Sequence, residues 1–232
     1  MAAIEIANKN LWVLFEYKGQ PICVTESLVS LWVVMGILIA FAVVVRVRLK
    51  NFTDVPKGFQ NFVETTVEMM HNLARNSMGP KLEKMGGYFY AIFAFILCSN
   101  YSGIFMLRPP TADLATTAAM GLSTFGLIHF FGMTERKGAY FKEYLEPTPV
   151  LLPINIVGEL AKPVSLSFRL FGNLVGGMII IGIMYSMMPT PVTFLVPTVA
   201  HIWFDVFVGF LQTFIFVMLS MTFIQQKAYV IE

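Results

Sequence analysis

The sequence predicts an all-α membrane protein with five transmembrane helices, the last two of them long and steeply tilted, and one interfacial amphipathic helix. Of its 232 residues, 56% are hydrophobic and only 13% are charged, whereas a soluble domain usually carries about 25% charged residues. Five apolar runs are long enough to cross a bilayer as helices. The formal net charge of +2 is too small to indicate a nucleic-acid partner.

Hydropathy and helical spacing define the first three spans and the amphipathic helix. The first apolar run ends at Arg46 and Arg48, and Pro109 with Pro110 stops the second. Between these runs, apolar side chains recur at helical spacing among polar ones, which is typical of a helix on the membrane surface. We therefore expect an external segment at 1–24, membrane helices at 25–46, 87–106 and 113–133, and the interfacial helix at 51–84.

The last two apolar segments, 151–188 and 192–226, are too long to stand upright in a bilayer. Each has roughly 35–38 residues and spans about 50–57 Å as a helix, against a hydrocarbon core about 30 Å thick. The simplest solution is a steeply tilted hairpin that turns near Pro189 and that Pro163 and Pro197 are free to bend. The alternative is that each segment hides a loop.

The distribution of Lys and Arg sets the expected orientation of the chain. If five spans alternate across 1–232 as a single membrane domain, eleven of the 16 basic residues fall on one side. These eleven are Arg46, Arg48, Lys50, Lys57, Arg75, Lys81, Lys84, Arg136, Lys137, Lys142 and Lys227. Because basic loops remain in the cytoplasm, we expect the N-terminus outside and the C-terminus in the cytoplasm or its equivalent.

Arg169 is the most informative residue of the long hairpin. No other Lys, Arg, Asp or Glu lies between Lys162 and Asp205. A guanidinium at membrane depth costs about 2.5–3.5 kcal/mol, and Arg cannot avoid this cost by losing its proton. Helical spacing predicts a polar stripe on this helix, formed by Glu159, Lys162, Ser165, Arg169 and Asn173.

The following apolar segment carries a second polar stripe, and the two helices should be antiparallel neighbours. His201, Asp205 and Gln212 are spaced four and seven residues apart, which places them on one helix face. Gly172 and Gly176 form a small-xxx-small pair that lets another helix approach closely. Ionisable and amide side chains inside spans suit an ion pathway with a charge barrier.

Structural interpretations compete with this functional one. Ser165, Asn173 and Gln212 could be polar packing contacts between helices. Arg169 and Asp205 could form an ion pair that serves structure alone. The sequence leaves both interpretations open.

The residues near the ends of the spans also have two interpretations. Glu159 and Lys162 could simply extend to the cytoplasmic interface. Asp113 could cap the helix that begins at Leu114, or it could line an outer water-filled funnel together with Asn100. Local sequence favours capping for Asp113.

Motifs for nucleotide, cofactor or metal binding are absent from the sequence. It contains no Gly-rich phosphate loop, no His-x-x-x-His pair and no Ser nucleophile elbow, and Cys23 and Cys98 have no metal or redox spacing. We therefore expect no cofactor. Two function classes remain: an ion-conducting membrane subunit, and a secondary transporter, which five spans without repeated halves fit poorly.

Three motifs carry a resemblance to a known family. Residues 162–173 read KPVSLSFRLFGN, residues 108–114 read RPPTADL and residues 211–216 read LQTFIF. In these motifs, and in its overall plan from about residue 25 onward, the chain resembles subunit a of the F-type ATP synthases. The resemblance implies one span, an interfacial helix and four further spans, the last two long and tilted around a rotating ring of c subunits.

The resemblance also implies roles for both stripes. Arg169 would face the carboxylate of each passing c subunit, expel its ion and block a direct leak between two offset half-channels, with Gln212 beside it. The outer half-channel would be lined by Asn173, His201 and Asp205, with Asn100 and Asp113 at its mouth. The residues toward the inner half-channel would be Ser165, Lys162 and Glu159.

One position departs from the family pattern. Many members carry Glu or His nine residues after the motif Arg, paired with an ionisable residue on the last helix. Here that position is Met178, and the partner position is Asp205. We therefore expect the outer relay to rest on Asp205 and His201 rather than on a pair between the two helices.

The sequence thus predicts a non-catalytic stator subunit that couples proton or sodium-ion flow to ATP synthesis in the plasma membrane of a bacterium. Its expected partners are the c-ring proteolipids, b-type peripheral stalk subunits, the rest of the complex and bilayer lipid. The alternative is an ion-conducting subunit of another rotary motor or a component of a secondary transporter.

Overall fold

The computed structural model describes residues 10–17, 20–53, 55–105, 107–145, 148–188 and 190–229. Two strands come first, β1 (Asn10–Tyr17) and β2 (Gln20–Thr25). The helices that follow are α1 (Glu26–Arg48), α2 (Phe59–Met78), α3 (Gly86–Tyr101), α4 (Leu114–Arg136), α5 (Gly138–Leu145), α6 (Leu152–Met187), α7 (Thr190–His201) and α8 (Gly209–Ala228). A π-helical segment, η6 (Ile202–Val208), joins α7 to α8. Short 3₁₀ helices are η1 (Leu49–Asn51), η2 (Pro80–Met85), η3 (Ser102–Phe105), η4 (Pro110–Ala112) and η5 (Pro149–Leu151).

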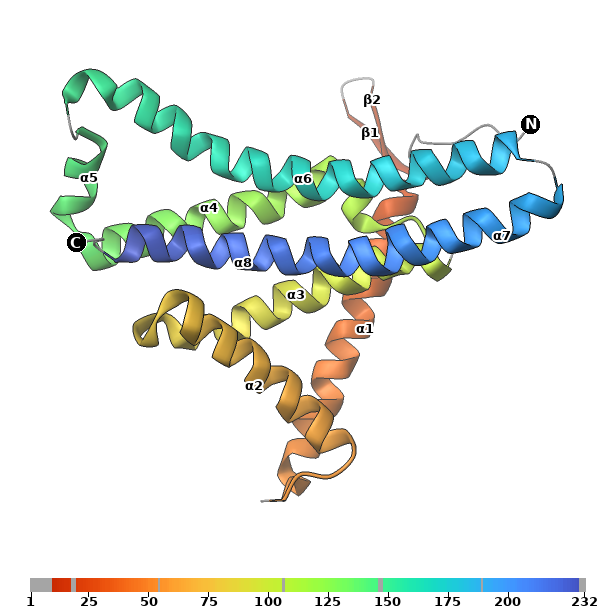
Figure 1. The fold of residues 1–232 in the computed structure, drawn as a ribbon, viewed down its shortest axis with the longest axis horizontal. Coiled ribbons are helices and arrows are strands. Elements are labelled where there is room, and N and C mark those ends of the chain that lie inside the picture. Colours follow the sequence, from red (N-terminus) through yellow and green to blue (C-terminus); the bar gives the residue numbers. More distant parts are fainter. Residues whose placement is uncertain are drawn as a thin grey trace.

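The predicted fold class, an all-α membrane protein, is confirmed. Five helical stretches within the described residues are long and apolar enough to cross a membrane: Glu26–Arg48, Pro80–Phe105, Leu114–Arg136, Pro149–Met187 and Leu195–Ala228. In Figure 1, α6 lies above the continuous rod of α7, η6 and α8, while α1 crosses the other helices at a steep angle. Helix α4 packs against both α6 and α8, and α3 packs against α8. This packing fixes the hairpin that carries both polar stripes.

Helix α6 forms without an internal loop. At 36 residues it extends about 54 Å at 1.5 Å per residue, so the alternative of a hidden loop does not apply to it. Pro163 lies inside the helix, where its ring removes a backbone hydrogen bond. The Ser167 hydroxyl lies 2.7 Å from the Pro163 carbonyl oxygen and 3.1 Å from that of Thr117, which ties this irregular turn to α4.

The predicted interfacial helix at 51–84 is shorter than expected and is followed by a 3₁₀ turn. Helix α2 covers Phe59–Met78, and Gly79 caps its C-terminus. The φ of 79° at Gly79 suits glycine because this residue has no Cβ. Its amphipathic pattern matches its packing: Val63, Met70 and Ala74 are buried. Asp54 of the predicted range lies outside the described residues.

The N-terminal segment and the charged loop contain elements that the sequence analysis did not anticipate. Strands β1 and β2 pair antiparallel, with Asn10 opposite Thr25 and Tyr17 opposite Gln20. Helix α5 occupies most of the loop at 135–146, where its short length gives too few turns for a periodic signal. Residues 1–9 and 18–19 of the expected external segment, and the end residue Met106 of the second predicted span, lie outside the described residues.

Two apolar clusters hold the bundle together. One includes Ile96, Met120, Leu166, Leu170 and Phe216, contributed by α3, α4, α6 and α8. The other joins α2, α3, α4 and α8 through buried side chains that include Met70, Phe89, Ile128, Val217 and Ile224. Both clusters bury side chains of α8, which packs against α2, α3, α4 and α6.

We expect Gly121→Ala to weaken the packing of α4 on α6. An added Cβ would lie 2.7 Å from the Pro163 carbonyl oxygen, and overpacking of this kind usually costs about 1–3 kcal/mol. The midpoint of thermal unfolding, measured on the detergent-solubilised protein, should fall. Gly126→Ala on the same helix is the matched control, because nothing lies within 4 Å of its added Cβ; equal midpoints in the two variants would contradict the expectation.

Candidate functional site

The two polar stripes meet at a pair of amides. The Asn173 amide nitrogen Nδ2 donates to the Gln212 oxygen Oε1 at 2.6 Å. Gln212 is only 4% exposed, and its own nitrogen Nε2 is buried without a hydrogen-bond partner among the described residues. A buried donor left without an acceptor costs about 1–3 kcal/mol, so this nitrogen requires a water or a group from another chain.

Arg169 lies one turn from this amide pair, on an open face of α6. Its side chain is exposed, as is that of Ser165 one turn earlier. Within the described part of the chain, Arg169 makes no ion pair or hydrogen bond, and Asp205 pairs with His201 instead. The structural ion pair between Arg169 and Asp205 is therefore not formed.

The same face of α6 is lined by glycines. A Cβ added at Gly172 or Gly176 would meet nothing within 4 Å, whereas one at Gly177 would meet the Phe204 side chain at 3.4 Å. Gly177 thus serves packing inside the chain. The described residues therefore leave the space beside Gly172 and Gly176 unfilled, next to Arg169, where a group from outside the chain can fit.

His201 and Asp205 form a close pair at the start of η6. The His201 nitrogen Nδ1 and the Asp205 oxygen Oδ2 are 2.6 Å apart, and the Asp205 side chain is 15% exposed. The Tyr185 ring of α6 lies 6.0 Å from the His201 ring, centre to centre. Segments of π-helix occur frequently at functional sites, and nothing in the local sequence signalled this one.

Asn100 is a buried connection between α3, η4 and α8. Its nitrogen Nδ2 lies 3.1 Å from the Gly209 carbonyl oxygen and 3.3 Å from Thr213 Oγ1, and its oxygen accepts from the Thr111 hydroxyl at 2.8 Å. Asn100 is 2% exposed, so its amide binds three partners within the fold. The structure thereby gives Asn100 a packing role, and its predicted place at a channel mouth stays a prediction.

Asp113 caps α4. Its carboxylate accepts a hydrogen bond from the Ala115 backbone nitrogen at 3.0 Å, and its backbone is extended, as an N-cap requires. The capping interpretation is therefore confirmed. A further role of Asp113 in lining an outer funnel stays a prediction.

Glu159 is the centre of a buried charge cluster at the other end of α6. Lys162 Nζ lies 2.9 Å from both carboxylate oxygens, and Lys227 Nζ of α8 lies 2.8 Å from Oε1. Lys227 is only 5% exposed and also lies over the Tyr144 and Tyr140 rings, at 4.8 and 5.8 Å. Glu159 and Lys162 therefore do not simply extend to the interface.

Sequence reasoning missed the part that Lys227 plays. It counted Lys227 among the topogenic charges at the end of the last span, because local spacing cannot relate residue 227 to residue 159. Thr111, Thr213 and Ser167 were missed for the same reason, since their partners lie on other helices.

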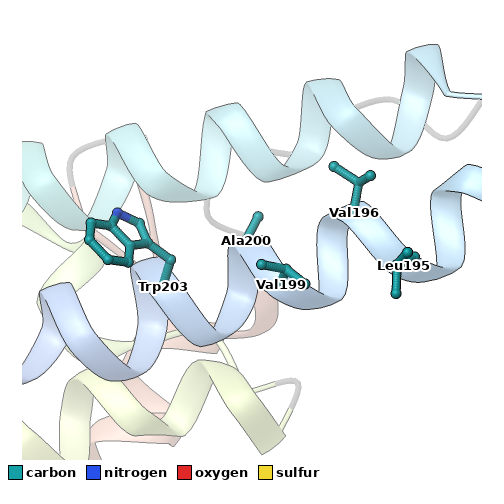
Figure 2. Close-up of a pocket in the computed structure, with 5 residues that line it drawn as sticks. All are labelled: Leu195, Val196, Val199, Ala200 and Trp203. Atoms are coloured by element: carbon teal, nitrogen blue, oxygen red, sulfur yellow. The ribbon is translucent and has the colours of Figure 1, made fainter.

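A cavity of about 430 Å³ adjoins the His201 and Asp205 pair. Figure 2 shows its lining side chains on α7 and at the start of η6, with Val196 and Ala200 pointing toward the neighbouring α6. The lining consists of Leu195, Val196, Val199, Ala200 and Trp203. This apolar lining suits hydrocarbon and provides no polar route to Asp205.

The fold and the site define a multi-pass α-helical membrane protein that carries ionisable side chains inside its spans, a feature that usually marks ion or substrate pathways. The family model described as ATP synthase A chain matches residues 28–225. The chain belongs to this family, which confirms the resemblance seen in the motifs around Arg169.

Named relatives agree with this assignment. The chain is 37% identical over 219 residues to "ATP synthase subunit a, sodium ion specific" of Propionigenium modestum, covering 87% of this chain and 73% of the relative. It is 37% identical over 214 residues to "ATP synthase subunit a 1" of Syntrophotalea carbinolica, covering 90% and 86%. A second protein of that organism, "ATP synthase subunit a 2", is 38% identical over 202 residues, covering 83% and 81%.

We expect Asn100→Ala to destabilise the contact between α3 and α8. The substitution leaves the buried Gly209 carbonyl and Thr111 hydroxyl without this partner, at a cost of about 1–3 kcal/mol. Thermal unfolding of the detergent-solubilised protein should begin at a lower temperature. Asn61→Ala, at an exposed position of α2, is the control and should leave the midpoint unchanged; a similar loss in both variants would refute the packing role of Asn100.

Proposed function

We propose that this chain is the ion-translocating stator subunit of a rotary F-type ATP synthase in a bacterial plasma membrane. In this proposal it offers two offset half-channels to a ring of c subunits and couples the flow of protons or sodium ions to ATP synthesis. The catalytic nucleotide sites belong to other subunits. The family assignment favours this function over a secondary transporter.

The observation that carries the proposal is the uncovered charge of Arg169. The guanidinium is permanently charged, sits in the middle of α6 and is exposed on a face that this chain leaves open. At membrane depth such a charge is stable only against a counter-charge or water. A carboxylate on a neighbouring chain, brought close by Gly172 and Gly176, supplies that counter-charge.

A fixed positive charge at this place acts as a barrier. A cation that approaches Arg169 is repelled, and the repulsion is strong where the dielectric constant is low. An ion therefore crosses only by leaving one half-channel on the moving ring and entering the other after rotation. One charge that crosses the membrane releases about 2.3 kcal/mol per 100 mV, and the barrier prevents its loss through a direct leak.

The outer half-channel is proposed to use Asp205 and His201. The 2.6 Å contact between their side chains is short enough to pass a proton, and Met178 offers no ionisable partner on α6. Asn173 and Gln212 stand between this pair and Arg169. Asn100 and Asp113 are proposed to lie toward the mouth, Asp113 in addition to its role as the cap of α4.

The inner half-channel is proposed to run along the exposed face of α6 at Ser165. Glu159 and Lys162 lie nearer the cytoplasmic end of that helix. The N-terminus is proposed to lie outside and the C-terminus in the cytoplasm, with b-type peripheral stalk subunits holding the chain against the ring. Whether ATP hydrolysis by the assembled complex requires Na⁺ distinguishes a sodium-ion carrier from a proton carrier.

We expect Arg169→Ala to abolish ATP-driven ion pumping while the complex still assembles. The side chain is exposed and makes no contact that the fold depends on, so its loss should remove the barrier without unfolding the protein. Pumping is measured as acidification or Na⁺ uptake by inverted membrane vesicles. Arg46→Ala, at an exposed position at the end of α1, serves as the control, and normal pumping by Arg169→Ala would exclude the proposed mechanism.

We expect Asp205→Asn to slow ion translocation strongly over a range of pH. The amide keeps a hydrogen bond to His201 but cannot accept and release an ion as the carboxylate does. Ion flux into vesicles is the measurement. Glu64→Gln removes a carboxylate from an exposed position of α2 and should have no effect, whereas unchanged flux in Asp205→Asn would exclude Asp205 as a relay.

A further inference from the structure

Among the described residues, two polar contacts join α6 directly to α8, one a turn away from Arg169 and one near the start of α6. The first is the hydrogen bond between Asn173 and Gln212, at 2.6 Å. The second is the ion pair between Glu159 and Lys227, at 2.8 Å. Both link the same two antiparallel helices, so together they fix how one helix is placed along the other.

The two contacts belong to one register. From Glu159 to Asn173 is about 21 Å along α6, and from Gln212 to Lys227 is about 22 Å along α8, at 1.5 Å per residue. The Lys162 ammonium lies over the Phe223 ring at 5.5 Å, about one turn from the contact between Glu159 and Lys227 on each helix. If one helix moved by a single residue, its side chains would also turn by about 100°, and both contacts would be lost together.

Apolar contacts cannot define this register by themselves. Lipid tails are as apolar as the side chains between helices, so the hydrophobic effect gives little preference for one alignment inside a bilayer. Directional polar contacts do give such a preference. Around Gln212, the side chains of Phe210, Leu211 and Phe214 are exposed, so they do not add to the burial of this part of α8.

We propose that Lys227 is a positioning residue that sets the register of α8 on α6 and thereby holds Gln212 against Asn173, next to Arg169. In this inference Lys227 acts through Glu159 and at a distance, because it lies about 22 Å from Gln212 along α8. Its location is well defined, since the Tyr144 ring lies 4.8 Å from its ammonium and Tyr140 donates to or accepts from Tyr144 at 2.7 Å. Asn155 further fixes this loop by donating to the Tyr144 carbonyl at 2.9 Å.

The charges of the cluster allow a variant that keeps the fold. Glu159 binds two ammonium groups, one from its own helix and one from α8. Lys227→Met therefore leaves the carboxylate paired with Lys162, so Glu159 does not become a buried charge without a partner. Lys162→Met is the matched control, because it removes the other lysine from the same carboxylate and keeps the ion pair between Glu159 and Lys227.

The register can be measured without ion transport. A Cβ added at Gly177 lies 3.4 Å from the Phe204 Cβ, close to the separation of about 3.5–4.5 Å in disulfides. Gly177→Cys with Phe204→Cys, in a chain with Cys23→Ser and Cys98→Ser, reports the alignment of α6 and η6 through the rate of disulfide formation. The rate is followed under mild oxidation in membranes that contain the assembled complex.

We expect Lys227→Met to slow disulfide formation several-fold, while Lys227→Arg, which keeps the ion pair, and Lys162→Met form the disulfide at the original rate. Unchanged disulfide formation in Lys227→Met would overturn the inference. Equal slowing in Lys162→Met would also overturn it, because the effect would then come from the cluster in general.

The consequence for transport rests on the proposed function and is measured separately, in chains without the reporter cysteines. We expect ATP-driven ion pumping to fall in Lys227→Met and to recover in Lys227→Arg. Slower disulfide formation with normal pumping would support the positioning role and contradict the proposed role of Gln212 in transport. Loss of pumping with an unchanged disulfide rate would place Lys227 on the ion path itself and overturn the inference.

Discussion

The permanent charge of Arg169 on an open face of α6 is the constraint on which the rest of the molecule depends. A guanidinium at membrane depth costs about 2.5–3.5 kcal/mol on insertion scales, and the chain does not neutralise it. Asp205, the counter-charge that the sequence analysis considered, is already paired with His201 at 2.6 Å. Within the described residues no side chain is paired with the guanidinium, and the fold exposes it at one depth and on one face of α6.

The long hairpin of α6 with α7, η6 and α8 sets the depth and the face at which Arg169 is exposed. Because α6 and the rod of α7, η6 and α8 exceed the thickness of the hydrocarbon core, polar groups at different points along them can lie at different depths. The amides of Asn173 and Gln212 stand near Arg169, and the cluster around Glu159 lies several turns away. Helix α4 packs against both α6 and α8. The Ser167 hydroxyl, one turn after Pro163 in α6, donates a hydrogen bond to the Thr117 carbonyl of α4.

Sequence could predict those features that depend on local chemistry. Spans follow from runs of apolar side chains, and the stripe through Arg169 follows from the 3.6-residue repeat of a helix. The capping role of Asp113 follows from its place before an apolar run. For Asn173 and Gln212, the sequence predicted only that their two helices lie side by side. Residue spacing within each helix does not determine how far one helix is shifted along the other.

The features that sequence did not predict are those that depend on that offset or on weak local signals. Lys227 meets Glu159 across two helices, so no local pattern relates them. Asn100 reaches Gly209 and Thr213 in the same way. The π-helical segment η6 contains no residue type that would distinguish it from an α-helix. The two strands before α1 are too short to show a clear alternation of apolar and polar residues.

The glycines of α6 separate the parts of this chain that serve folding from those that serve a partner. A glycine inside a helix costs about 0.5–1 kcal/mol relative to alanine. Gly177 offsets that cost by letting Phe204 approach, whereas an added Cβ at Gly172 or Gly176 would meet nothing. The fold therefore gains nothing from the latter two positions. In the proposed function, their cost is compensated when a helix of a neighbouring subunit approaches the face that also carries Arg169.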